Sequence, residues 1–261
     1  MTNDNHLTTA DSWDSIWTGR RTNRAVTIVK QRLRQTRSWR QLLTDLLDST
    51  GKPGQIEVLE LGCAPGSMLV ELHQLRPAYR YSGIDYAPGG LEAAEKALAA
   101  AGVPASLHLG DIRTSTLPSA DLVVSFGLVE HFTDPAEAIG YHRRFLRPGG
   151  MAAVTVPNYS HPVTARLMRR FCPETAAAHN LDIMSTEQMK AAFERAGFTD
   201  VRTGQAGGPL LPCSQVRPGT LGAMYSITSR AWNLGSNFVP QGWPWASVIW
   251  GTGVSPEPAD A

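Results

Sequence analysis

The chain has 261 residues, 42% of them hydrophobic and 18% charged, which suffices for one large core or for a domain with an appended lobe. No run of about 18 apolar residues occurs, and the polar N-terminus lacks the pattern of a secretory signal. We therefore expect a cytoplasmic protein with no membrane partner. The formal net charge of +1 gives no overall attraction to nucleic acid.

Cysteines and clustered basic residues add little to this picture. Cys63, Cys172 and Cys213 are far apart and odd in number, which predicts neither a disulfide framework nor a zinc site. Residues 20–40 carry eight basic side chains and no acidic one. A solvated helix face explains this charge more simply than a phosphate or RNA contact, so nucleic acid is not an expected partner.

In chain order, residues 1–50 are predicted to form a helical segment that closes over the site as a lid. Residues 51–207 alternate short apolar runs with helical patterns, which predicts a parallel sheet covered on both faces. The apolar runs are "IEVLEL", "YRYSGID", "ASLHLGD", "ADLVVSFG" and "MAAVTVP". Two final strands are expected at "TDVRTG" and "WASVIWGTG", the second antiparallel and at the end of the sheet.

Capping residues support the helices of this central part. Asp134 followed by Pro135 predicts a helix start in "DPAEAIGYHRRFL". Ser185 with Gln188 predicts a capping box that opens "STEQMKAAFERAGF", and Gly197 is expected to close that helix.

Residues 208–244 are predicted to be a cap insertion with a helix in "GTLGAMYSITSRAWNLGSNF", and residues 245–261 the last strand and a tail. Connections this long are usually functional or disordered, and the aromatic content here disfavours disorder. With the segment 159–184, the insertion is expected to cover a pocket for a small molecule. The candidate substrate residues are Tyr225, Trp232, Phe238, His161, His179 and Asp182, each of the last three with an ordinary surface position as its alternative.

The stretch "IEVLELGCAPGSMLVEL", Ile56 to Leu72, joins an apolar run to a Gly-containing turn and a helical pattern. Such a turn presents backbone N–H groups and a helix N-terminus at the carboxyl edge of a sheet, where open α/β folds bind ligands. Gly62 and Gly66 permit close approach of the backbone to a ligand. The next apolar run ends in Asp85, 23 residues after Gly62, a spacing that suits a carboxylate on ribose hydroxyls. The combination predicts a nucleoside site.

Glu60 distinguishes this turn from a dinucleotide fingerprint. A pyrophosphate site favours G-x-G-x-x-G, whereas here an acidic residue stands two positions before the first Gly. A buried carboxylate is poorly suited to phosphate, but it suits a cationic amino acid tail or a network that holds one.

These residues resemble the first motif of the class I S-adenosylmethionine-dependent methyltransferases. "LELGCAPG" has the acidic residue and the spaced glycines, with Ala64 where Gly is frequent. The resemblance continues through "GIDYAPGGLEAA", "LGDI", "ADLVVSFGLVEHFTDP" and "FLRPGGMAAVTVPN", about residues 55 to 200. It implies a doubly wound, Rossmann-like α/β fold with a seven-stranded, mostly parallel sheet, an antiparallel last strand and a helical cap.

The resemblance also implies a site for S-adenosyl-L-methionine and a role for each of its residues. They are Glu60, Gly62, Cys63 and Gly66 for the methionine moiety and ribose, Asp85 and Tyr86 for ribose and adenine, Asp111 and Ile112 for the adenine, and Ser125, Phe126 and Gly127 for the region of the methyl group. "SWDSIW" resembles a segment whose aromatic residues close over the cofactor. Trp13 and Trp17 are therefore candidate lid residues, with plain packing as the alternative.

Methyl transfer from a sulfonium depends on alignment and exclusion of water, and it needs a base only when the acceptor is a hydroxyl or a charged amine. His131 in "VEHFTDP" is the candidate base because it follows the fourth strand and its unperturbed pKa suits the task. A structural or cofactor-side role is the alternative. Some quinone-pathway O-methyltransferases bind a metal with an additional acidic residue where this chain has Gly127, so no metal is expected.

The sequence therefore predicts an enzyme that methylates O or N of a small molecule, in specialised metabolite or cofactor biosynthesis as the resemblance suggests. One alternative is an RNA or protein methyltransferase, although no interleaved aromatic and basic residues or added recognition domain support it. Another is a non-catalytic regulator or scaffold that keeps the cofactor pocket.

Overall fold

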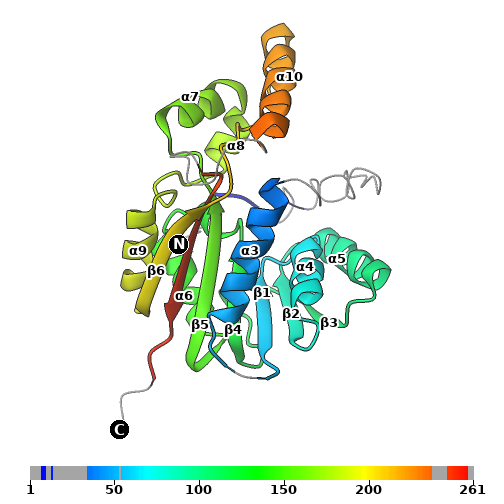
Figure 1. Cartoon of the computed structure of the whole chain (residues 1–261), viewed down its shortest axis with the longest axis vertical. Helices are drawn as coiled ribbons and strands as arrows, with labels where there is room; N and C mark the ends of the chain where they lie inside the picture. The colour runs from blue at the N-terminus through cyan, green and yellow to red at the C-terminus, as the bar shows by residue number, and fades with distance from the viewer. Residues whose placement is uncertain (1–6, 10–12, 14–33, 53, 237–245, 258–261) are drawn as a thin grey trace.

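A seven-stranded sheet forms the centre of the part of the chain that the structure, a computed structural model, describes (Figure 1). The described residues are 7–9, 13, 34–52, 54–236 and 246–257. Trp17, Phe238 and most of the basic segment 20–40 lie outside them, so their predicted roles are not addressed by the structure.

The strands cross the sheet in the order β3-β2-β1-β4-β5-β7-β6. In chain order they are β1 (Glu57–Leu61), β2 (Arg80–Asp85), β3 (Ala105–Leu109), β4 (Ala120–Phe126), β5 (Leu146–Pro157), β6 (Thr199–Ala206) and β7 (Val248–Val254). Among them β7 runs in the opposite direction to the other six, so both of its pairings, with β5 and β6, are antiparallel. The predicted fold class, with its antiparallel last strand, is confirmed.

The predicted place of the last strand at the end of the sheet is wrong. β7 lies between β5 and β6 and pairs with both, so β6 forms the edge. The physical reason is polarity. β7 reads VIWGTGV and has four buried residues, whereas β6 reads TDVRTGQA and has none. An interior strand has both faces covered, so the apolar strand takes the interior position and the charged one the edge.

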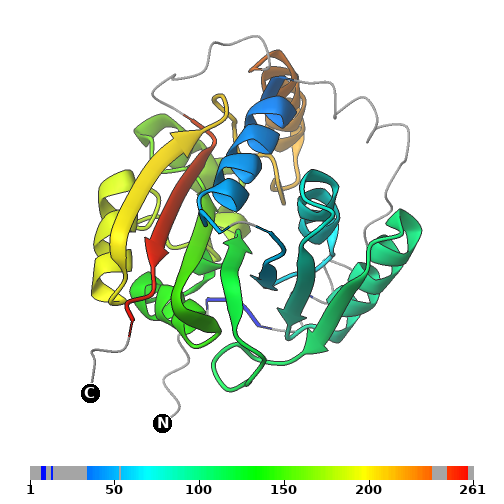
Figure 2. The same cartoon turned by 60° about the horizontal axis from the view of Figure 1, so that its bottom comes forward.

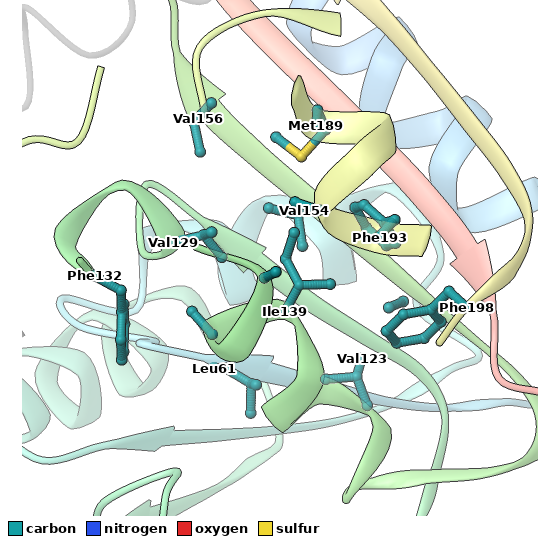
Figure 3. Close-up of a cluster of buried hydrophobic side chains, with 14 of the residues drawn as sticks. Leu61, Val123, Val129, Phe132, Ile139, Val154, Val156, Met189, Phe193 and Phe198 are labelled. Atoms are coloured by element: carbon teal, nitrogen blue, oxygen red, sulfur yellow. The ribbon is translucent and has the colours of Figure 1, made fainter. Parts of the chain in front are cut away.

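Helices cover both faces of the sheet (Figure 2). One face carries α3 (Arg34–Asp48), α4 (Ser67–Leu75) and α5 (Pro88–Ala101), and the other carries α6 (Pro135–Arg143), the short helix η1 (Val129–His131) and α9 (Thr186–Arg195). Alternate strand residues divide between two cores: Leu122 belongs to the first face and Val123 to the second. Figure 3 shows the second core, where Val123 and Val154 of the sheet meet Ile139 and Phe193 of the helices.

The predicted helix starts are confirmed by their caps. The Asp134 carboxylate accepts from the N–H of Ala136 at 3.0 Å, and Pro135 opens α6. The Ser185 hydroxyl accepts from the N–H of Gln188 at 3.1 Å at the start of α9. Each cap satisfies an N–H that the helix leaves without a partner.

A group of helices stands beyond one end of the sheet, at the top of Figure 1. It comprises α7 (Pro162–Phe171), α8 (Pro173–Ala177) and α10 (Thr220–Gly235), the helix expected in the cap insertion. We call residues 158–183 and 208–236 the cap lobe. Its small core joins Met168 and Cys172 to Tyr225. Within the described parts of the chain, none of the helices has the length and apolar character needed to cross a membrane.

Candidate functional site

A cavity of about 200 Å³ opens where β1, β2 and β4 end. It is lined by Thr8, Trp13, Gly62, Ala64, Ile84, Asp85, Tyr86, Gly110, Asp111, Ile112, Phe126, Gly127, Leu128, His131 and Phe132. The carboxyl ends of parallel strands are where open α/β sheets bind ligands. Eight of the predicted cofactor and catalytic residues therefore meet at one place, and Trp13 joins them.

Asp85 ends β2 and is 8% exposed. Its Oδ2 accepts from the N–H of Ala64 at 3.0 Å, and its Oδ1 accepts from the N–H of Ala87 at 2.9 Å. One carboxylate thus ties the turn after β1 to the start of α5. A carboxylate can accept several hydrogen bonds, so Asp85, which lines the cavity, can also accept from a ligand there.

The turn between β1 and α4 needs glycine at two positions. Gly62 has a φ of 71° and Gly66 a φ of 82°, values that side chains with a Cβ rarely adopt. At Gly62 a Cβ would lie 3.1 Å from Leu128, and at Gly66 it would lie 2.9 Å from Ala94 in α5. Gly62 lines the cavity, whereas Gly66 allows α4 and α5 to pack closely.

Glu60 lies in β1 and is 2% exposed. Burial raises the pKa of its carboxyl well above the usual range, and the charge of Asp85 raises it further. Its Oε2 has no hydrogen-bond partner among the described residues. Cys63, also buried, has a raised thiol pKa because of its burial and the same two carboxyls. Both residues are buried, and neither is among those that line the cavity.

Three further predicted cofactor residues line the cavity on the β2 and β3 side: Tyr86, Asp111 and Ile112. The Asp111 carboxylate is bound by the guanidinium of Arg113 at 2.7 Å and by that residue's backbone N–H at 2.8 Å. Burial raises the pKa of Tyr86 to about 12, so its hydroxyl stays neutral at physiological pH. Ile112 provides an apolar wall, being only 7% exposed.

Ser125 is a further predicted cofactor residue that does not line the cavity. The Nδ1 of His142 lies 3.1 Å from the carbonyl of Ala138, which can only accept, so Nδ1 carries the proton. The Nε2 of His142 then accepts from the Ser125 hydroxyl at 3.0 Å. Burial lowers the pKa of His142 to about 4, so this imidazole is neutral. The pair is part of the core between β4 and α6.

His131 ends η1 and lines the cavity beside Gly127. Its Nδ1 lies 2.7 Å from the carbonyl of Ala178, so Nδ1 donates and Nε2 is the accepting nitrogen of the neutral ring. The edge of Trp13 meets the ring at 4.9 Å between centroids, with an angle of 87°. The first described residues thus close over His131, since the N–H of Leu7 also donates to its carbonyl at 2.8 Å.

His179, one of the predicted substrate residues, lies next to His131. Their ring centroids are 4.6 Å apart. The Nδ1 of His179 donates to the carbonyl of Thr175 at 2.6 Å, so its Nε2 is also an acceptor. Burial lowers the pKa of His179 and keeps the ring neutral. The cap lobe therefore supplies a second imidazole beside the candidate base.

Glu130 is a buried carboxyl next to these imidazoles. It is 1% exposed, its Oε2 has no hydrogen-bond partner among the described residues, and burial raises its pKa to about 8. Three possible metal-ligand atoms lie within 4.8 Å of one another, one each from Glu130, His131 and His179. Imidazole and carboxylate are ligands that zinc accepts, so metal analysis of the purified protein checks the expectation of no metal.

Among the described residues, none of the other predicted substrate residues lines the cavity. Tyr225 stacks on Phe171 at 4.2 Å between centroids, and its hydroxyl donates to the carbonyl of Pro212 at 2.7 Å. The indole N–H of Trp232 donates to the carbonyl of Pro209 at 3.1 Å. His161 caps the start of α7. Asp182, another candidate substrate residue, does not line the cavity either. His179 does not line the cavity itself, but its ring packs beside that of His131, which does.

Several cavity residues were not among the predicted ones. They are Thr8, Ala64, Ile84, Gly110, Leu128 and Phe132. Most are direct neighbours of predicted residues: Ile84 precedes Asp85, and Phe132 follows His131. A rule that includes the residues flanking each motif would have found these. Thr8 has no comparable signal, because its place depends on the N-terminal chain folding back over the sheet.

Comparison with known proteins agrees with this geometry. Residues 31–203, well over half of the chain, match a family described as methyltransferase domain. The chain belongs to this family. The resemblance to class I S-adenosylmethionine-dependent methyltransferases is thereby confirmed at the level of the family.

Two curated relatives carry substrate names. The chain is 27% identical over 165 residues to malonyl-[acyl-carrier protein] O-methyltransferase of Paenibacillus sp., covering 59% of this chain and 59% of the relative. It is 29% identical over 164 residues to trans-aconitate 2-methyltransferase of Methylobacterium nodulans, covering 59% of this chain and 62% of the relative. The matched region thus spans about six tenths of the length of each relative.

A solved structure shares the fold. Phosphoethanolamine N-methyltransferase 2 of Haemonchus contortus, in complex with phosphomonomethylethanolamine and S-adenosylhomocysteine, aligns with a TM-score of 0.56 at 15% identity. The alignment covers 83% of this chain and 53% of that chain. This likeness supports the Rossmann-like architecture of the sheet and its helices.

Proposed function

We propose that the protein is an enzyme that transfers a methyl group from S-adenosyl-L-methionine to an oxygen or nitrogen of a small molecule. The observation that carries the proposal is the meeting of Asp85 and His131 in one cavity. Asp85 is a buried acceptor at a strand end, and His131 offers a fixed acceptor nitrogen. Membership of the methyltransferase family supports the same chemistry.

The residues present fit the cofactor. The Asp85 carboxylate lines the cavity at a strand end and can accept from ribose hydroxyls, and Ile84 and Ile112 offer apolar surface for a purine. The buried Oε2 of Glu60, without a partner among the described residues, suits a donor from the amino acid part of the cofactor, directly or through water. S-adenosylmethionine supplies a methyl group on a positively charged sulfur.

His131 is proposed to accept the proton of the methyl acceptor at Nε2. The bond from Nδ1–H to the carbonyl of Ala178 fixes the tautomer and the ring orientation. Trp13, packed on the ring, helps to keep water from that nitrogen. A neutral imidazole accepts a proton from a hydroxyl or an ammonium group, so these are the acceptors that the site favours.

The acceptor is proposed to carry a hydroxyl or an amine. The two curated relatives are named for malonyl-[acyl-carrier protein] and trans-aconitate, both of which contain carboxylates. Among the described residues that line the cavity here, none is lysine or arginine. A carboxylate acceptor would be held best by a cation, whereas the imidazoles of His131 and His179 suit a hydrogen-bond donor.

The test is methyl transfer from labelled S-adenosylmethionine to a library of phenols, alcohols, amines and carboxylates. Label should appear in a hydroxyl or amine compound, and His131→Gln should reduce its rate. Parallel reactions with total RNA and with protein test the other acceptor classes. Label found only in RNA or protein, or no transfer despite tight cofactor binding, would overturn the proposal.

A further inference from the structure

α10 in the cap lobe presents its large apolar side chains to solvent. The residues that face the lobe are Gly222, Tyr225 and Ser229, of which only Tyr225 is large. The residues that face outward include Leu221 at 62% exposed, Met224 at 60%, Ile227 at 70% and Leu234 at 60%. A surface helix normally has the opposite arrangement, with its apolar residues against the core. An exposed apolar set of this kind marks an interaction surface.

The outward face of α10, which we define as Leu221, Met224, Ile227, Ala231, Trp232 and Leu234, covers about half of the helix circumference. Arg230 is the one charged residue in the helix and lies at the margin of this face. A helix that pairs with a copy of itself needs only a narrow stripe of apolar positions. The broader face is typical of a helix that lies in the surface of a membrane.

The cap lobe is also basic. Arg166, Arg169, Arg170, Arg217 and Arg230 are all exposed in it, against two acidic residues, Glu174 and Asp182. The lobe thus has a net charge of +3, from five arginines less two acids, while the whole chain has +1. None of these arginines takes part in an ion pair with another described residue.

Two of these arginines, Arg170 and Arg217, adjoin the start of the outward face of α10. A surface depression is lined by Arg170, Arg217 and Leu221, with Glu174 as its one acidic lining residue, where the connection enters the helix. Arginines beside exposed Leu, Met, Ile and Trp match a surface that combines anionic head groups with apolar chains. A second copy of the chain, in contrast, would bring two sets of arginines toward each other.

We infer that the cap lobe docks on an anionic lipid surface through the outward face of α10. The apolar side chains enter the boundary between head groups and acyl chains, and the arginines bind lipid phosphates. α8 ends beside His131, so docking places the lobe that borders the cavity on the membrane. Docking does not depend on methyl transfer and is measured without cofactor.

The experiment is co-sedimentation of the full chain with two kinds of vesicle. One contains phosphatidylcholine alone, and the other an equal mixture of phosphatidylcholine and phosphatidylglycerol. The protein should bind the mixed vesicles, and Met224→Ser with Ile227→Ser should weaken that binding about tenfold or more. Leu109→Ser is the matched control, because Leu109 is 61% exposed on the edge strand β3, away from the cap lobe, and should change nothing.

A second variant tests the charge. Arg166→Gln with Arg169→Gln should weaken binding to the mixed vesicles about fivefold for each arginine, and added salt should reduce binding similarly. Both side chains are exposed, so this variant should fold even if the α10 variant does not. The inference is overturned if wild-type protein ignores the mixed vesicles or if the arginine variant binds them equally well. It is also overturned if light scattering shows a dimer that the α10 variant dissociates.

Discussion

The region around the cavity buries polar groups, whereas the cap lobe exposes apolar ones. In the segments that lead to the cavity, two carboxyls are buried: Glu60 and Glu130 are 2% and 1% exposed, and each has an oxygen with no partner among the described residues. In the cap lobe, large apolar side chains such as Ile227 are exposed. Both arrangements cost free energy in the isolated protein. The comparison indicates that the cavity is built for a polar ligand and the lobe for a surface.

The two regions meet at His131. The carbonyl of Ala178 in the cap lobe fixes the tautomer of that ring, and His179 packs beside it. A change in the lobe can therefore alter catalysis through His131 while cofactor binding at Asp85 stays intact. The following variants are chosen to separate the two regions.

The largest effect is expected from His131→Ala. Loss of a positioned base should lower the turnover number about 10² to 10⁴-fold, with cofactor affinity within a few-fold. The wild-type rate should rise with pH as the imidazole loses its proton and then level off, and the variant should lack that rise. His108→Ala, on the edge strand β3, is the control. A variant that keeps more than about a third of the activity and the same pH profile would reduce His131 to a structural role.

His142 tests the buried polar pair that it forms with Ser125 between β4 and α6. Its pKa is lowered to about 4 in the folded protein, against about 6.5 in the unfolded chain, so the unfolded chain binds the extra proton between these values. Stability should be full above pH 6.5 and fall toward pH 4, by about 3 kcal/mol from this group. Denaturant unfolding measured between pH 4 and pH 6.5 should show that the free energy of unfolding depends less steeply on pH in His142→Asn than in the wild type. An equal slope in both proteins would mean that the imidazole is charged when folded.

Asp85→Ala should weaken binding of S-adenosylhomocysteine by about 1.5 to 3 kcal/mol, because charge-assisted bonds to the ribose are lost. Asp85→Asn separates charge from shape, since its amide oxygen still accepts one of the two backbone N–H bonds. Met224→Ser in the cap lobe is the matched control and should leave the affinity unchanged. Calorimetry gives all three values. Equal affinities for Asp85→Ala and the wild type would place the ribose elsewhere.

The smallest effect is expected from Trp232→Ala. The sequence predicts a substrate contact here, and the indole lies in the cap lobe, outside the cavity. We expect a rise of about two- to threefold in the Michaelis constant for the acceptor with no change in cofactor affinity. Steady-state kinetics with both substrates varied will check this. A larger effect on the cofactor than on the acceptor would contradict the separation of the two regions.

Most of the sheet follows from local pattern. The five parallel strands before residue 160 were predicted from apolar runs; β1, β2, β4 and β5 are largely buried, whereas the edge strand β3 has no fully buried residue. The place of β7 in the sheet was not predicted. The pairing order depends on which of the last two strands can be buried on both faces. The order therefore follows from the difference in polarity between β6 and β7, which neither strand's sequence shows by itself.

The site was predictable where motifs fix the ends of strands. Gly62, Asp85, Asp111 and His131 all line one cavity because parallel strands end at one edge. The substrate residues were less predictable, since aromatic content does not distinguish a pocket from a lobe core. Tyr225 fills that core instead.

The central claim is that the cavity at the ends of β1, β2 and β4 binds S-adenosylmethionine. Titration calorimetry of the wild-type protein with S-adenosylhomocysteine, and with NAD under the same conditions, tests it most directly. The account predicts one saturable site for S-adenosylhomocysteine, a raised melting temperature in its presence, and no heat with NAD. Tight binding of NAD with no response to S-adenosylhomocysteine would contradict it.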